Sequence, residues 1–75
     1  MPGRKEKTML KHIDRYSDGQ SSIFDVYVLT YESGKTRSVT GFENLPKTAK
    51  RFIAAAENFQ FMREKSGQYF HRFSA

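Results

Sequence analysis

The chain has 75 residues, of which 37% are hydrophobic, with seven Phe, four Tyr and no Cys. A chain of this length forms one small domain, because it buries only about 60% of its unfolded surface, and a large enzyme scaffold is excluded. The absence of cysteine excludes a disulfide framework, a thiolate zinc site and a Cys nucleophile, and it favours a reducing, cytoplasmic compartment. No apolar run is long enough for a membrane span or a signal peptide, so no membrane partner is expected.

The net charge of +5 at pH 7 favours a polyanionic partner. This charge is unevenly distributed. Residues 1–11 carry four bases against one acid, residues 12–46 carry three bases against five acids, and residues 47–75 carry six bases against two acids. The sequence therefore predicts that the N-terminal segment and the C-terminal third make the contacts with a polyanion.

The first half of the chain has the pattern of short strands. Residues 1–7 are polar and charged, and we expect them to form a flexible basic tail. From Thr8 onward, β-branched and aromatic runs flank Asp18-Gly19 and Ser33-Gly34, dipeptides that are typical of two-residue hairpin turns. These signals predict a three-stranded antiparallel meander.

Two-residue turns would also fix the register of the strands and therefore their faces. The register places Val28 opposite Val39 and His12 opposite Asp25. The predicted core face holds the apolar residues Met9, Ile13, Phe24, Val26, Val28 and Val39. The opposite face is expected to be exposed and free of Lys and Arg, with Tyr16, Tyr27, Tyr31 and Phe42 among its members.

A helix is predicted to follow Pro46, a residue tolerated in a first helical turn. Its apolar stripe contains Leu45, Ala49, Phe52, Ile53, Ala56 and Phe59. The absence of β-branched residues after Ile53, together with Gly67 as a C-cap, favours a helix to about residue 65, followed by an aromatic tail over 66–75. The alternative is a hairpin of residues 59–64 and 68–73 that turns at 65–67. The expected fold is α+β: a single βββα domain over 8–65, in which the meander packs against one C-terminal helix.

Catalytic or metal-binding constellations are not evident, so we expect no enzyme and no cofactor. His12 and Asp14 share a strand face, but two ligands are fewer than a zinc site needs. The stretch Ser33-Gly34-Lys35-Thr36 resembles the end of a phosphate-binding loop, yet the upstream glycine is missing and a hairpin turn explains it.

The strongest functional signal is the basic side of the predicted helix. Lys47, Lys50 and Arg51 stand in its first turns, with Phe61 and Lys65 on the same side. Positive charge at a helix N-terminus opposes the macrodipole, and phosphate binding would explain it, whereas a solvated surface is the alternative explanation. Arg4, Lys5 and Lys7 would add cations from the tail.

Three short motifs carry a family resemblance: Ser33-Gly34-Lys35-Thr36-Arg37, then Gly41-Phe42, then Ala49 and Phe52. Over residues 24–56 the chain resembles the AP2-like, arm-type N-terminal DNA-binding domains of phage and transposon tyrosine recombinases. The resemblance implies a three-stranded sheet on one helix, a mobile-element origin and DNA contacts through Lys35 and Arg37.

Together, these features predict a small non-enzymatic nucleic-acid-binding accessory protein of phage or mobile-element type, with DNA as the expected ligand. The alternative is a small phage-type protein that binds and inhibits a host protein, such as a defence nuclease or polymerase. It would use the aromatic face of Tyr16, Tyr27, Tyr31 and Phe42. The sequence does not decide between a monomer and a dimer. Salt separates the two functions, because nucleic-acid binding through Lys and Arg weakens steeply with salt.

Overall fold

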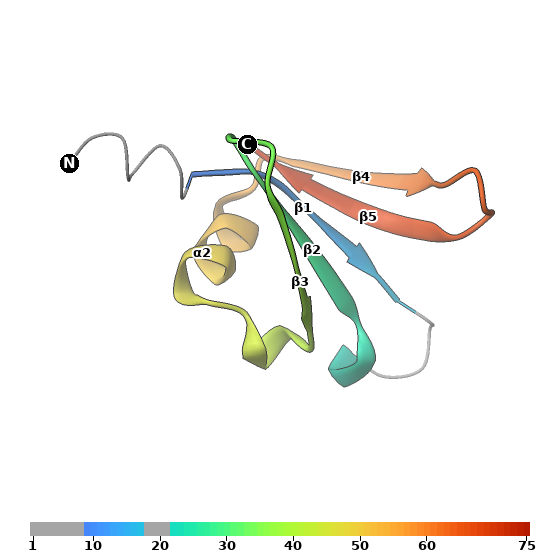
Figure 1. The fold of residues 1–75 in the computed structure, drawn as a ribbon, viewed down its shortest axis with the longest axis horizontal. Helices are drawn as coiled ribbons and strands as arrows, with labels where there is room; N and C mark the ends of the chain where they lie inside the picture. Colours follow the sequence, from blue (N-terminus) through green and yellow to red (C-terminus); the bar gives the residue numbers. More distant parts are fainter. Residues whose placement is uncertain (1–8, 18–21) are drawn as a thin grey trace.

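The computed structural model describes residues 9–17 and 22–75, which adopt an α+β fold. One antiparallel sheet, in the order β3-β2-β1-β5-β4, is formed by β1 (Leu10–Tyr16), β2 (Val26–Tyr31), β3 (Thr36–Thr40), β4 (Asn58–Arg63) and β5 (Tyr69–Ser74). The other elements are helix α2 (Lys47–Ala55) and the 3₁₀ turns η1 (Ser22–Phe24) and η2 (Phe42–Asn44). Figure 1 shows α2 on one side of the sheet and the β4–β5 hairpin projecting away from it.

The sheet has five strands, so the predicted three-stranded meander accounts for only its β1–β2–β3 part. The helix predicted to reach residue 65 ends at Ala55, and the predicted aromatic tail over 66–75 contains strand β5. The alternative hairpin is confirmed, and it docks on β1 with Ile13 opposite Phe73. Phe59 and Phe61 stand two residues apart, as do Tyr69, His71 and Phe73 in turn, and this strand period overrides the lack of β-branched residues.

The β2–β3 turn is one residue longer than predicted. The Tyr31 N–H donates to the Lys35 carbonyl at 2.9 Å, and the Gly34 N–H donates to the Tyr31 carbonyl at 2.9 Å. Gly34 has φ +92°, in the left-handed region that glycine tolerates best. This is the three-residue loop in which a turn ends in a glycine bulge, and the β4–β5 loop repeats it with Gly67.

The added loop residue exchanges the two faces of β2, because side chains alternate along a strand. Tyr27 lies opposite Val39, where Val28 was expected. Tyr27 and Leu29 are therefore buried in the core, whereas Val26 and Val28 lie half-buried on the other side of the sheet. The predicted core face is wrong for β2 and correct for Ile13 of β1 and for Val39.

The predicted Asp18-Gly19 turn lies outside the described residues, but the strands on either side of it are described. His12 lies opposite Thr30 instead of the predicted Asp25, and Ile13 pairs with Leu29. The connection between β1 and β2 spans residues 17–25 and includes η1. Two residues expected in the core, Met9 and Phe24, are consequently exposed.

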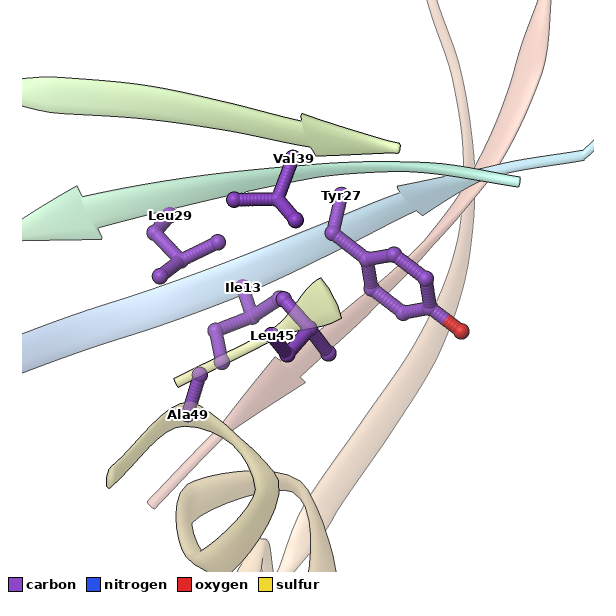
Figure 2. Close-up of a cluster of buried hydrophobic side chains, with 6 residues drawn as sticks. All are labelled: Ile13, Tyr27, Leu29, Val39, Leu45 and Ala49. Atoms are coloured by element: carbon purple, nitrogen blue, oxygen red, sulfur yellow. The ribbon is translucent and has the colours of Figure 1, made fainter. Parts of the chain in front are cut away.

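The core forms where α2 and the segment before it cover one side of the sheet. Half-buried Phe52 and Ile53 of α2 pack against it, as the predicted stripe requires, whereas Ala56 caps the helix and Phe59 lies on β4. Figure 2 shows the buried cluster, which consists of Ile13, Tyr27, Leu29, Val39, Leu45 and Ala49. We call this side of the sheet the helix face and the opposite side the open face.

On the open face, an ion pair joins β5 to β1. Arg72 donates from Nε to Asp14 Oδ1 at 2.7 Å and from Nη2 to Asp14 Oδ2 at 3.1 Å. His12 Nε2 lies 3.8 Å from Asp14 Oδ2. The bidentate geometry fixes the hairpin against the meander. In the part of the chain that the structure describes, no helix is long and apolar enough to cross a membrane.

Candidate nucleic-acid interface

A row of aromatic rings lies on the helix face of the β4–β5 hairpin. Phe59 is opposite Phe73, and Phe61 is opposite His71. Directly opposed residues share a face, and Phe73 is also opposite the core residue Ile13. These ring-bearing residues therefore stand on the same side of the sheet as α2.

Successive rings in this row alternate between the two strands at nearly constant spacing. The ring centroids of Phe73 and Phe59 are 4.9 Å apart, those of Phe59 and His71 4.9 Å, those of His71 and Phe61 4.9 Å, and those of Phe61 and Tyr69 5.0 Å. The Phe59–His71 and Phe61–Tyr69 pairs are stacked, with interplanar angles of 7° and 5°. We call these five residues the aromatic ladder.

Each end of the aromatic ladder meets an arginine. The Arg15 Cζ atom lies 5.5 Å from the Phe73 ring centroid, and the Arg63 Cζ atom lies 5.4 Å from the Tyr69 centroid. Both separations are within the range of cation–π contacts. Phe59, Phe61 and Tyr69 expose large parts of their rings, with Phe61 the most exposed at 63%. Phe73, at the Arg15 end, is buried, so the exposed aromatic surface of the ladder runs from Phe59 to Tyr69 and ends at Arg63.

The charged side chains that the strands place on this face of the sheet are all positive. The strand register places Arg15, Arg37 and Arg63 on the helix face. Asp14, the one acidic residue within the five described strands, lies on the open face. The described strands therefore contribute only positive charge around the aromatic ladder.

A pocket of about 380 Å³ opens beside the ladder. Its walls come from β1, β2, η1 and η2, and they include Arg15, Asp25, Tyr27, Phe42, Glu43 and Asn44. Gly41 holds η2 close to this wall, because its N–H donates a hydrogen bond to the Asp25 carbonyl at 2.8 Å. Gly41 has φ +87°, and an added Cβ would lie 3.3 Å from the Ile23 carbonyl oxygen.

Two residues that line the pocket each bury a polar atom that has no partner among the described residues. Asp25 is only 5% exposed, and its Oδ1 accepts no hydrogen bond; the buried Nε of Arg15 donates none to any described residue. Burial raises the pKa of the Tyr27 hydroxyl, and the charge of Arg15 opposes this shift. Leaving such groups unpaired costs about 1–3 kcal/mol each, and more for charged groups.

The predicted cationic residues of the helix do not join the ladder. Lys47, Lys50 and Arg51 lie on α2. The Nζ atom of Lys50 is 5.6 Å from the ring centroid of Phe42, a residue that lines the pocket. Arg4, Lys5 and Lys7 lie outside the described residues.

Other predicted nucleic-acid residues are distributed over the two hairpins. Phe61 belongs to the aromatic ladder, although it lies on a strand and not on the predicted helix. Lys65 lies in the turn after β4, at the Arg63 end of the ladder. Lys35 lies in the β2–β3 turn, and Arg37 lies on β3, at the edge of the sheet opposite β4.

The predicted exposed face of Tyr16, Tyr27, Tyr31 and Phe42 does not exist as one surface. Tyr27 is buried in the core, and Tyr31 packs against it. Tyr16 is on the open face, where its ring stacks on Phe70 at 4.8 Å and its hydroxyl donates to Glu64 Oε1 at 2.6 Å. Burial and this hydrogen bond raise the pKa of Tyr16 to about 12. The shifted register of β2 is the reason for the separation.

The remaining ladder residues and their arginines were not identified from the sequence. Phe59, Tyr69 and His71 carried a signal, because Phe59 stands two residues from Phe61, and Tyr69 two residues from His71, the spacing of side chains on one face of a strand. Arg15 gave no signal, since its position beside the ladder depends on the pairing of β5 with β1.

The chain matches no protein-family model, no curated protein and no solved structure. Among residues 9–17 and 22–75, no group of three or more His, Cys, Asp or Glu is placed to hold a metal ion. Among the described residues, the aromatic ladder is the surface feature that points to a function.

Proposed function

We propose that this protein binds single-stranded nucleic acid, with DNA as the expected ligand, through the aromatic ladder. The observation that carries the proposal is the set of exposed rings on the hairpin, Phe59, Phe61 and Tyr69, with Arg63 over the Tyr69 ring at the outer end of the ladder. Exposed rings accept stacked bases, each worth about 1–3 kcal/mol, and arginines pair with the phosphates between them.

A single strand suits the aromatic ladder better than a duplex does. Phe59 and Phe61 stand two residues apart on β4, a distance of about 7 Å along a strand, and β4 is an edge strand. Bases can approach these rings only when they are unstacked from their neighbours, as in a flexible single strand. A duplex keeps its bases stacked and presents only phosphates.

The direct test replaces Phe61 and compares it with a matched control. Phe24, at the end of η1, is 60% exposed, almost the same as Phe61 at 63%. Binding of a fluorescent twelve-nucleotide oligo(dT) is measured by anisotropy at low salt. Phe61→Ala should weaken binding about 5- to 150-fold, equivalent to about 1–3 kcal/mol, whereas Phe24→Ala should leave it unchanged.

Salt dependence tests the arginine contacts in the same assay. For single strands the slope of log K against log salt is about −0.7 for each neutralised phosphate. Arg63→Gln should flatten the slope by about that amount, whereas Arg37→Gln, which alters the opposite edge of the sheet, should not. The reverse result would move the binding site to the β2–β3 hairpin.

Two outcomes would overturn the proposal. One is that Phe61→Ala and Phe24→Ala bind oligo(dT) as tightly as the wild type does. The other is that the wild type binds no oligonucleotide and sediments as a dimer that Phe61→Ala converts into a monomer. The second outcome would identify the ladder as a contact between copies of this chain.

A further inference from the structure

We propose that two copies of this chain pair edge to edge through their β4 strands, antiparallel, so that their sheets become one continuous sheet. β4 is an edge strand that pairs with β5 on its inner side, and Figure 1 shows it along the outer edge of the projecting hairpin. Three observations support this contact: the free backbone groups of β4, the absence of features that block strand pairing, and the charges at the two ends of the strand.

The hydrogen bonds of the hairpin determine which backbone groups of β4 are free. The Glu64 N–H donates to the Gln68 carbonyl at 2.8 Å, so these two residues form a hydrogen-bonded pair. Bonded and non-bonded pairs alternate along two antiparallel strands. Every second residue from Glu64 therefore bonds to β5, whereas Phe59, Phe61 and Arg63 direct their N–H and carbonyl groups toward the free edge.

Nothing within β4 protects this edge. Natural edge strands are commonly protected by a charged residue, a proline or a bulge. The residues from Asn58 to Met62 are uncharged, include no proline and pair with β5 without a register shift, and all of them except Met62 are exposed. The other edge strand, β3, carries Arg37 in its interior. β4 is therefore the edge of this sheet that is open to another strand.

Charge complementarity identifies the second strand as another copy of β4. Two antiparallel registers join the free-edge residues of both copies with the longest overlap. One places Phe61 opposite the second copy's Phe61, and the other places it opposite the second copy's Phe59. Glu57, an exposed residue just before β4, then faces the second copy's Lys65 or Arg63. A twofold axis forms this opposite-charge contact twice.

These charges are available for the contact. Among the residues that the structure describes, neither Glu57 nor Lys65 makes an ion pair, because the ion pairs there join Asp14 to Arg72 and His12. A short strand of this kind makes an interface below the standard size of about 1,600 Å², which is typical of weak association. We therefore expect a Kd in the micromolar range.

Edge pairing joins the two aromatic ladders and does not cover them. A twofold axis perpendicular to the sheet keeps the same face of both copies on the same side. In both registers Phe61 faces a phenylalanine of the second copy, an aromatic cross-strand pair that stabilises a sheet. The contact therefore goes beyond the proposed function without competing with it.

Sedimentation velocity over a range of concentrations, without nucleic acid, tests the charge contacts. Glu57→Lys converts two attractions into two repulsions and should weaken the dimer about tenfold at low salt. Glu43→Lys makes the same charge change at an exposed residue of η2 and should leave the dimer unchanged. An equimolar mixture of Glu57→Lys with Lys65→Glu, or with Arg63→Glu, should restore it, because the mixed dimer again joins opposite charges. The mixture that does so identifies the register.

Amide hydrogen exchange by NMR tests the backbone pairing. Exchange of the Phe61 N–H should slow as the protein concentration rises, because the second copy then accepts its hydrogen bond. Ser38 is the matched control. The Tyr31 N–H donates to the Lys35 carbonyl, so by the same alternation Ser38 directs its N–H toward the free edge of β3. Its exchange should not depend on concentration.

Any of four results overturns the dimer. The wild type remains a monomer up to about 1 mM; Glu57→Lys weakens the dimer no more than Glu43→Lys does; neither mixture restores it; or the Phe61 amide gains no more protection than that of Ser38. Since none of these measurements contains nucleic acid, failure of the dimer leaves the oligo(dT) result standing. Failure of oligo(dT) binding likewise leaves the dimer standing.

Discussion

The Arg72–Asp14 ion pair tests whether the C-terminal hairpin docks on the meander. Arg72→Gln removes the two donors that lie 2.7 and 3.1 Å from the Asp14 carboxylate. Asp14 is only 6% exposed, so the substitution leaves a buried charge without its principal partner. Breaking a buried pair in this way costs about 3–5 kcal/mol.

The partial exposure of Arg72 reduces this expected loss of stability. The Arg72 side chain is 30% exposed, so water can enter the space that it vacates and solvate the carboxylate. We therefore expect a loss of about 2–4 kcal/mol. A chain of this size has a free energy of unfolding of about 4–11 kcal/mol, so the loss is a large fraction of the total.

Urea unfolding followed by circular dichroism measures the effect, with Asp14→Asn and the double variant completing a thermodynamic cycle. The double variant should be more stable than Arg72→Gln alone, because it buries no unpaired charge. Arg63→Gln, which changes an exposed arginine on the same hairpin, should stay within about 0.5 kcal/mol of the wild type. A loss below about 0.5 kcal/mol for Arg72→Gln would falsify the docking of β5 on β1.

Three further results are expected. Tyr27→Ala should cost about 3–5 kcal/mol in urea unfolding because Tyr27 is buried in the core, whereas Val28→Ala on the open face should cost less than about 1.5 kcal/mol; the opposite order would restore the predicted register. Burial and the charge of Arg72 lower the pKa of His12 below 6.5, against the opposing effect of Asp14. Since the unfolded chain then takes up a proton that the folded chain resists, the melting temperature should fall as the pH drops through about 6.5, and His12→Asn should flatten that dependence. Gly41→Ala should destabilise the fold by about 1–3 kcal/mol, because alanine is strained at this φ and crowds Ile23; a melting temperature equal to that of the wild type would contradict this.

Local sequence patterns predicted the helix and the meander, but they did not predict which face of β2 packs against the helix. Pro46 and the Ala49–Phe52–Ile53 stripe identified α2 and its buried side correctly. The dipeptide Ser33-Gly34 fits both a two-residue turn and the last two positions of a three-residue loop. Sequence alone does not distinguish them, yet the one-residue difference exchanges every side chain of β2 between the faces.

The candidate site was only partly predictable for a different reason. Phe61 was identified as an exposed aromatic next to cations; it is exposed, whereas the cation at this end of the ladder, Arg63, lies over the Tyr69 ring. The neighbours of Phe61 in space depend on whether residues 58–63 are helical or extended, and the aromatic residues there are compatible with both. The position of Arg15 depends on pairing with a strand more than fifty residues away, and no local pattern records such a pairing.

The pairing of β1 with β5 has a consequence for the order of folding. The β1–β2–β3 meander and the β4–β5 hairpin each join strands that are neighbours in sequence, so each can begin to form from local contacts. Their union requires Tyr16 to meet Phe70, and this closes a long loop whose entropy must be lost before the new contacts form. Until that step, the central strand of the final sheet has an unpaired edge, and this edge is where a half-folded chain would recruit a strand from another molecule.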